Sequence, residues 1–188
     1  MFGAEFPDFT RNARSLIDEG HPLAKPPSLR IGGTASGLGN YIAKRAAALR
    51  RENLRSVCVV VHAEKYWDNA CSAIEKVTGN PPYVLKRRGD VFGVDKPGIV
   101  LAKPEFVGGQ EFDAVIAVGL EDGLVPPKVK PDSFAESLKQ RALREMYLVF
   151  TRARFRLEIV VSVNSSVTSL LEKAIQGGLL KPPKRETK

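Results

Sequence analysis

The sequence has little cysteine and no long apolar run. Its 188 residues include two cysteines, Cys58 and Cys71, too few for a disulfide framework or a cysteine-rich metal site. Small thiols of this kind are typical of buried positions in a reducing compartment. No apolar run approaches the ~18 residues that span a membrane, and residues 1–15 carry acids and lack the apolar core of a secretory signal. We therefore expect a cytoplasmic protein with no membrane partner.

Acidic residues are outnumbered by basic ones. The chain has 29 Lys and Arg against 21 Asp and Glu, which gives a net charge of +8 at pH 7. A basic balance favours polyanionic partners such as nucleic acid or nucleotides, and it fits a solvated basic surface equally well. The length suits one domain with a sizeable core. We place that domain at residues 1–180 and a basic flexible tail at residues 181–188.

Apolar segments alternate with amphipathic ones along the chain. Val57–Val61 and Ala114–Val118 are continuous apolar runs, typical of strands that are covered on both faces. Residues 21–37 are rich in turn formers and are expected to be a connector. The pattern predicts helices at 8–20, 38–53, 63–80, 134–153 and 165–176, and further strands at 81–89, 98–103 and 155–163. This alternation predicts an α/β domain with a mostly parallel sheet flanked by helices, and such sheets bind ligands at the carboxyl ends of their strands.

A glycine-rich segment, residues 32–40, precedes a predicted helix but does not match a phosphate-binding loop. That loop needs G-x-x-x-x-G-K-[ST], whose lysine reaches the outer phosphates and whose hydroxyl holds Mg²⁺. Gly32 and Gly37 have the spacing, but Leu38 and Gly39 stand in the lysine and hydroxyl positions. The segment is therefore predicted to be a flexible turn before a helix, although an anion could rest on its amides.

Three other stretches carry a more specific pattern. Residues 108–127 read GGQEFDAVIAVGLEDGLVPP, with carboxylates at both ends of a buried strand. Residues 144–162 read REMYLVFTRARFRLEIVVS, and residues 9–17 read FTRNARSLI. Together, and in this order, they resemble the second RecA-like motor domain of UvrD/Rep-type superfamily 1 helicases. The likeness extends over nearly the whole chain and implies a RecA-like fold of the P-loop NTPase type.

The resemblance implies roles for individual residues. In such motors ATP lies between two RecA-like domains, and the second domain supplies cations to the outer phosphates and an acid to the sugar. Arg152 matches the family's threonine-arginine-alanine stretch and is expected to be an arginine finger, since a guanidinium is planar and bidentate toward phosphate. Arg14 is the second candidate. Glu111, which follows Gly109 in the nucleotide-contacting stretch, is expected to accept hydrogen bonds from the ribose hydroxyls.

Neighbouring acids and a histidine have plainer interpretations. Asp113 is expected to shape the loop or to cap a backbone amide. Glu121 and Asp122 are interpreted as solvated acids in the turn after the strand. His62, at the end of its strand, is expected to be structural.

Two clusters have competing explanations. Arg152, Arg154 and Arg156 could form an exposed basic row along one side of a strand, and only the joint pattern with residues 109–113 favours the finger. Tyr66 and Trp67 could stack on a nucleic-acid base, but packing within a helix is the preferred interpretation.

The sequence departs from the family in several ways. It holds no first motor domain, so ATP and Mg²⁺ would need that domain in cis or in trans, and no metal-binding residue is assigned. The chain alone is expected not to hydrolyse ATP. Gly108 stands where the family has a lysine that meets single-stranded DNA, and residues 87–98 join two strands directly where many relatives carry an inserted subdomain.

Two functions remain open on these grounds. The first is the C-terminal motor domain of a UvrD-like helicase ATPase, coupled to movement along nucleic acid, with single-stranded DNA as the favoured polynucleotide. The alternative is a non-catalytic module that retains the fold and binds nucleic acid or protein through a basic face. A G-x-x-x-x-G-K-[ST] domain encoded upstream of Met1 would favour the first.

Overall fold

The computed structural model describes residues 21–93, 98–128 and 134–184. In chain order the elements are β1 (Ser28–Ile31), α2 (Leu38–Arg51), β2 (Ser56–Val61), η2 (Glu64–Tyr66), α3 (Trp67–Thr78), β3 (Tyr83–Val84), β4 (Gly98–Ala102), η3 (Pro104–Phe106), β5 (Phe112–Val118), α4 (Ala135–Phe150), β6 (Ala153–Val161), η5 (Ser169–Leu171), α5 (Glu172–Gln176) and β7 (Lys181–Lys184). Among the described residues no helix is both long and apolar enough to cross a membrane.

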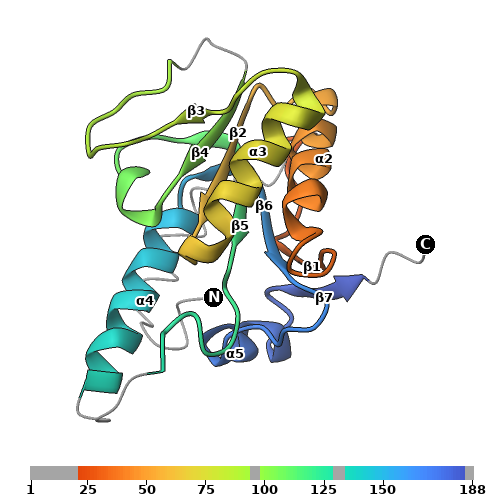
Figure 1. The fold of residues 1–188 in the computed structure, drawn as a ribbon. Coiled ribbons are helices and arrows are strands. Elements are labelled where there is room, and N and C mark those ends of the chain that lie inside the picture. The colour runs from red at the N-terminus through yellow and green to blue at the C-terminus, as the bar shows by residue number, and fades with distance from the viewer. Residues whose placement is uncertain (1–20, 94–97, 129–133, 185–188) are drawn as a thin grey trace.

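The described strands form one seven-stranded sheet in the order β3-β4-β2-β5-β6-β1-β7 (Figure 1). Every neighbouring pair runs parallel. The middle of the sheet is made by β2 and β5, which pair from Val57 opposite Ala114 to Val61 opposite Val118. Both strands are buried along their whole length, because helices cover both faces of the sheet. The predicted α/β fold and its two central strands are therefore confirmed.

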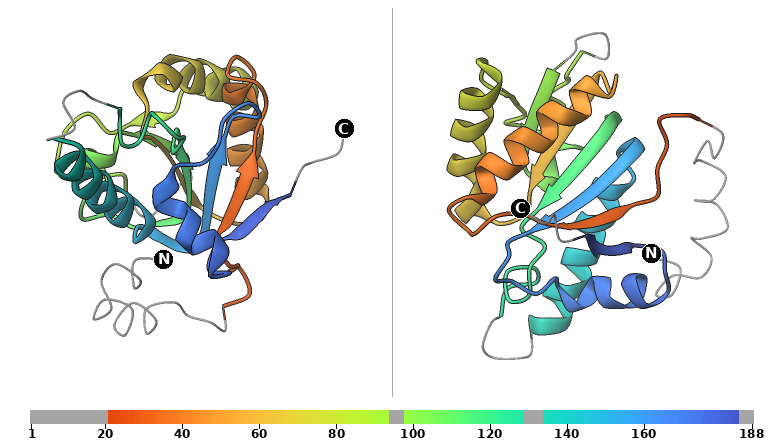
Figure 2. Two further views of the ribbon diagram at one scale, coloured as in Figure 1. Left: turned by 90° about the horizontal axis from the view of Figure 1, so that it is seen from below. Right: turned by 90° about the vertical axis from the view of Figure 1, so that its right-hand side faces the viewer.

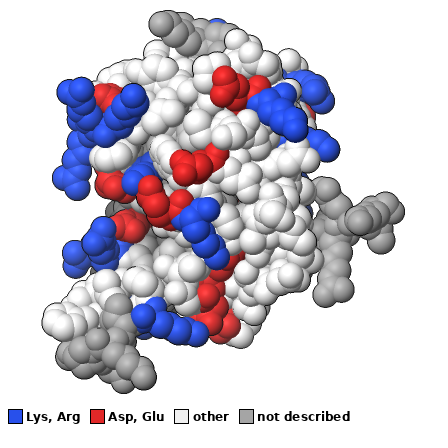
Figure 3. Space-filling model, viewed as in Figure 1, with Lys and Arg blue, Asp and Glu red and all other residues white. Residues whose placement is uncertain are grey.

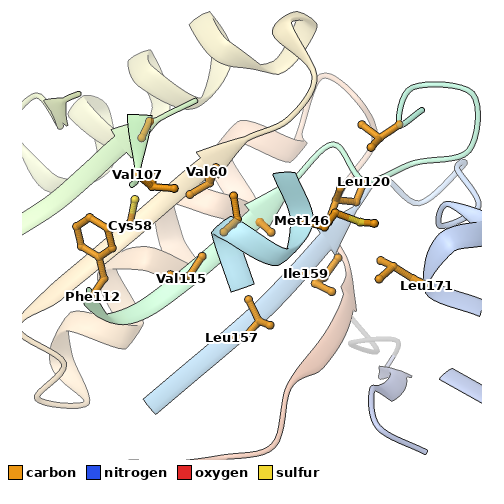
Figure 4. Close-up of a cluster of buried hydrophobic side chains, with 14 of the residues drawn as sticks. Cys58, Val60, Val107, Phe112, Val115, Leu120, Met146, Leu157, Ile159 and Leu171 are labelled. Atoms are coloured by element: carbon orange, nitrogen blue, oxygen red, sulfur yellow. The ribbon is translucent and has the colours of Figure 1, made fainter. Parts of the chain in front are cut away.

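Helices α2 and α3 cover one face of the sheet, and α4 and α5 lie on the other (Figure 2). Successive side chains of a strand point to opposite faces, so β2 contributes to both cores. Val57 and Val59 pack with α2 and α3, whereas Cys58 and Val60 pack in the cluster that includes Met146 of α4. Figure 4 shows this second cluster, in which side chains of α4 meet those of β5 and β6. Burial of each apolar side chain contributes about 1.5–3 kcal/mol, and this is the main force that fixes the helices on the sheet.

Three segments differ from the sequence-based expectation. β1 lies inside the expected connector, where its four residues are too few to show a strand pattern and pair with β6 and β7 instead. The last predicted helix is shorter, since residues 165–168 precede η5 and α5. β7 lies at the edge of the sheet, next to β1, where the sequence predicted no strand.

The N-terminal helix predicted at residues 8–20 lies outside the described residues, as do residues 185–188 of the predicted tail. The division into one domain and a flexible tail stays a prediction.

Candidate functional site

Arg152 and the loop that holds Glu111 lie side by side. Arg152 follows α4 and directly precedes β6, and Glu111 directly precedes β5. These two strands are parallel neighbours, with Phe112 opposite Ala153. The Phe112 amide donates to the carbonyl of Arg152 at 2.8 Å, and the Arg152 guanidinium lies 3.5 Å from the carbonyl of Gln110. The fold thus brings together two of the predicted site residues, whose roles stay predictions.

This cluster lies at the amino edge of the sheet. Arg152 and Glu111 each precede a strand, and in a parallel sheet all such residues meet at the same edge. We expected ligands at the carboxyl ends of the strands, but this site lies at the opposite edge of the sheet. The physical reason is that the cluster is made from the end of α4 and from a loop entering β5, whereas carboxyl-edge sites are made from loops leaving the strands.

The Arg152 side chain is folded back onto its own helix end. Its Nε donates to the Leu148 carbonyl at 3.2 Å, and a terminal nitrogen donates to the Thr151 hydroxyl at 3.1 Å. The last carbonyls of a helix have no intrahelical partner and carry partial negative charge, so they attract a cation. Arg152 is half-buried in this arrangement. To reach a ligand it must exchange these neutral acceptors for the ligand's oxygens.

Glu111 is in the opposite situation, because its carboxylate is exposed. No hydrogen bond or ion pair joins it to any residue that the structure describes. The preceding turn depends on Gly109, whose φ of 79° lies in the left-handed region that side chains disfavour. The loop therefore presents an unpaired carboxylate one strand away from Arg152.

Arg14, the second predicted arginine, lies outside the described residues together with residues 12–15. Its position relative to Arg152 stays a prediction.

Asp113 caps backbone amides, as the sequence predicted. Its Oδ2 accepts from the amides of Arg55 at 2.7 Å and Ser56 at 3.3 Å, and the Ser56 hydroxyl accepts from the Asp113 amide at 2.9 Å. These reciprocal bonds join β2 to β5 at the amino edge. The carboxylate that opens the buried strand is thus structural, and it leaves Glu111 as the acid that is open to a ligand.

The interpretation of Glu121 as a solvated turn acid is wrong. Glu121 is only 1% exposed. Its two carboxylate oxygens accept from the Tyr66 hydroxyl at 2.7 Å and from the Ser162 amide at 2.9 Å, and Lys65 Nζ lies 3.7 Å away. The chain folds back over the carboxyl ends of β2 and β6 at this point, so the acid is covered by segments remote in sequence. Tyr66 is accordingly a packing residue, and Asp122 is exposed as expected.

The interpretation of Arg152, Arg154 and Arg156 as an exposed basic row is also wrong. Arg156 is 6% exposed, its Nε donates to the carbonyl of Leu23, and its guanidinium lies 3.5 Å from Glu52. Burial lowers the pKa of Arg156. Arg154 is the exposed member, and it lies 3.5 Å from Oδ1 of Asp113. The arginines around the start of β6 therefore have separate environments.

His62 has the structural surroundings that were expected of it, with one unusual feature. Both ring nitrogens are buried and have no hydrogen-bond partner among the described residues. Burial lowers the pKa of His62 to about 3, so the ring is neutral near pH 7.

The described residues fit one part of an ATP site. A guanidinium suits phosphate oxygens and an open carboxylate suits ribose hydroxyls. Within the described ranges, no three His, Cys, Asp or Glu side chains gather as metal ligands. The glycine-rich turn after β1 does not supply a phosphate loop, because Leu38 is fully buried and Asn69 donates to the Ser36 carbonyl at 3.1 Å. A lysine loop and the Mg²⁺ ligands would have to come from another domain.

Comparison with known proteins identifies the fold. No family model matches the chain, and neither does any curated protein. Among solved structures, the chain is similar to the C-terminal domain of a possible DNA helicase from Lactobacillus plantarum WCFS1, with a TM-score of 0.62, 16% identity, and coverage of 92% of this chain and 93% of that one. It is also similar to domain 2 of the Mss116p DEAD-box helicase bound to an RNA duplex. The TM-score is 0.49, the identity is 12%, and the match covers 87% of this chain and 65% of that one. The first likeness identifies the fold as that of a RecA-like helicase C-terminal domain.

Proposed function

We propose that the chain is the second motor domain of a UvrD/Rep-type superfamily 1 helicase. The observation that carries the proposal is the adjacency of Arg152 and the Gly109–Glu111 loop at one edge of the sheet. Two stretches about 40 residues apart in sequence meet there, and both are stretches in which the sequence resembles this family. The fold agrees with the proposal, since it is that of a helicase C-terminal domain.

In this function the chain supplies half of an ATP site. Arg152 donates to the outer phosphates, Arg14 is the second cation, and Glu111 accepts from the ribose hydroxyls. ATP brings the phosphoryl group, and a first motor domain holds the nucleotide with Mg²⁺. Charge grows on the phosphoryl oxygens in the transition state, so the contribution of Arg152 is expected mainly in turnover rather than in nucleotide affinity.

The proposed nucleic-acid partner is single-stranded DNA, which the motor would move along. The half-buried Trp67 lies near the carboxyl ends of β2 and β4, with Lys103 Nζ 5.7 Å from its ring centroid and Lys65 close by in sequence. An aromatic ring beside lysines suits a strand whose bases stack while its phosphates meet cations. Because Gly108 replaces the family's DNA-contacting lysine, we assign the phosphate contacts to these two lysines. Each would exchange its present acid for phosphate, since Lys103 Nζ lies 2.7 Å from Glu64 and Lys65 Nζ lies 3.7 Å from Glu121.

The test is steady-state ATP hydrolysis by a protein that combines this chain with the first motor domain, at saturating single-stranded DNA. We expect Arg152→Ala to lower turnover by about a thousandfold with a much smaller change in nucleotide binding. Arg152→Lys should not restore turnover, because an ammonium cannot reproduce the planar fork. The chain alone should show no hydrolysis.

Arg154→Ala is the matched control, since Arg154 is exposed and lies in β6, two residues after Arg152. Arg156 does not serve this purpose because its burial would confound catalysis with folding. Parent-like turnover of Arg152→Ala, or an equal loss in Arg154→Ala, would show that Arg152 is not a finger.

The alternative function is a non-catalytic module that keeps the fold and binds nucleic acid through its basic face. The Trp67 and Lys103 pair is the observation that favours it, because this surface needs no second domain. In that case the chain alone should bind single-stranded DNA, Trp67→Ala should weaken that binding, and ATP should have no effect on it.

A further inference from the structure

An open hollow of about 580 Å³ lies beside the Arg152 site. Its lining includes three arginines, Arg88, Arg141 and Arg144, and two glutamates, Glu105 and Glu145. The residues come from α4, from η3 and from the segment between β3 and β4. Figure 3 shows Lys and Arg side chains gathered at the upper left, where Figure 1 places the segment between β3 and β4.

The charged side chains that line this hollow are three arginines and two glutamates, a net charge of +1 that includes the carboxylate of Glu105. Arg141 pairs with Glu145 along α4 at 2.8 Å. Arg88 and Arg144 are exposed and form no hydrogen bond or ion pair with the described residues. Two unpaired guanidinium groups on one hollow suit an anion with several oxygens, because each group presents a planar fork of donors.

The hollow adjoins the Arg152 site, although Arg152 itself does not line it. Leu148 lines it, and the carbonyl of the same residue accepts from Arg152 Nε. Arg144, Leu148 and Arg152 follow one another at four-residue intervals, so they lie along one side of α4 and its end. Gly108 also lines the hollow and adjoins Gly109. The hollow and the Arg152 site therefore share α4 and the loop at Gly108 as neighbouring structural elements.

Gln110 fixes the segment that carries Arg88. Its Oε1 accepts from the Phe92 amide at 2.7 Å, and its Nε2 donates to the Asp90 carbonyl at 2.6 Å. Asp90 in turn accepts from the amides of Lys86 at 2.7 Å and Arg87 at 3.0 Å. The oxygen and the nitrogen of the Gln110 amide each bind a backbone group, one on each side of Val91. The Gln110 side chain therefore holds this loop in place.

This arrangement depends on the amide of Gln110. A leucine at residue 110 could make neither hydrogen bond. The clamped loop also belongs to the short segment that stands where many relatives carry an inserted subdomain. This chain thus has both Gln110 and the loop that carries Arg88, which the glutamine holds in place.

We propose that Arg88 and Arg144 bind phosphate groups in this hollow and that Gln110 is the positioning residue that holds Arg88 there. The volume lies in the range of small-ligand sites and accommodates a polyphosphate. The proposal rests on the proposed function only for the source of the phosphates, which is either a nucleotide or the backbone of nucleic acid.

The experiment is titration of the chain with sodium tripolyphosphate by calorimetry. Arg88→Ala and Arg144→Ala should each weaken binding about tenfold or more, as expected for a lost charge-assisted hydrogen bond. Arg87→Ala is the matched control, because Arg87 is also an exposed cation of the same loop but does not line the hollow. An equal loss in Arg87→Ala, or no binding at millimolar tripolyphosphate, would overturn the proposal.

Gln110→Leu separates positioning from direct contact. It should speed hydrogen exchange at the Phe92 amide and weaken tripolyphosphate binding about as much as Arg88→Ala. Combined with Arg88→Ala it should cause no further loss of affinity. A full additional loss in the double variant would contradict the positioning role.

Two competitors identify the source of the phosphates. Displacement of tripolyphosphate by ATP supports a nucleotide, and displacement by an oligothymidylate supports a nucleic-acid backbone. If Arg152→Ala leaves ATP turnover intact while Arg88→Ala and Arg144→Ala lose tripolyphosphate, the proposed function fails and the phosphate site stands. The reverse result overturns the phosphate site alone.

Discussion

Glu158 is a buried acid whose removal should destabilise the fold. It lies in β6 with 4% of its side chain exposed. Its oxygens accept from Arg45 of α2 at 2.7 and 2.5 Å, and Arg30 of β1 lies 2.8 Å away. The hydrogen bond to Glu158 raises the pKa of Arg45. One carboxylate therefore pairs with two arginines from two elements, between the sheet and α2, and Arg45 has a second acidic partner in Glu52 at 3.4 Å.

Glu158→Gln keeps the shape of the side chain and removes its charge. Breaking a buried ion pair from one side costs about 3–5 kcal/mol, because the partner remains as an uncompensated charge. Arg30 and Arg45 keep 25% and 18% of their side chains exposed, so water can solvate them in part, and we expect about 3 kcal/mol. That is a large share of a typical stability of about 5–15 kcal/mol.

The assay is equilibrium urea unfolding followed by the fluorescence of the single tryptophan, Trp67. Glu145→Gln is the control, since it breaks the exposed pair with Arg141 and should cost no more than about 0.5 kcal/mol. Arg45→Met combined with Glu158→Gln should cost less than the sum of the single changes, because it also removes one stranded cation. Equal losses in Glu158→Gln and Glu145→Gln would refute the reasoning.

Two further predictions concern other buried polar groups. Burial lowers the pKa of His62 to about 3, whereas a histidine in the unfolded chain has a pKa of about 6.5. When the pH falls below about 6.5, the unfolded state therefore takes up a proton that the folded state does not. This group should therefore lower the free energy of unfolding by about 2 kcal/mol between pH 7 and pH 5. His62→Phe should remove that loss in urea unfolding at the two pH values. An unchanged difference in stability between pH 7 and pH 5 would contradict this prediction. Tyr66→Phe removes a donor to the buried Glu121 and should cost about 1.5–3 kcal/mol in urea unfolding. Tyr83→Phe, at a residue 47% exposed, is the control and should be neutral in the same assay.

The central fold was predictable because its signal is local. An unbroken apolar run such as Val57–Val61 needs cover on both faces, and a parallel sheet with helices on both sides provides it. β1 gave no such signal, because it is four residues long and contains Arg30. The charge of Arg30 is met by Glu158, which is remote in sequence, so nothing near β1 reveals that a strand can form there.

The candidate site was predictable only in part for the same reason. The motif stretches drew attention to Arg152 and Glu111, and the pairing of β5 with β6 brings them together. The burial of Glu121 depends on Tyr66, 55 residues away, and that of Arg156 on Leu23, 133 residues away. Local sequence carries no information on such partners, so both residues were assigned to the surface.

The folded-back position of Arg152 has a consequence for the proposed motor. Its present acceptors are neutral oxygens, which contribute about 0.5–1.5 kcal/mol each, whereas a phosphate offers charge-assisted bonds of about 1.5–3 kcal/mol. The exchange is therefore favourable only when a phosphate comes within reach, and a first motor domain would bring it there on closure. Until then the end of α4 holds the guanidinium close to the Glu111 loop. Arg152 would thus engage the phosphate only in the closed state, and ATP hydrolysis would be tied to domain closure without any further switch in this chain.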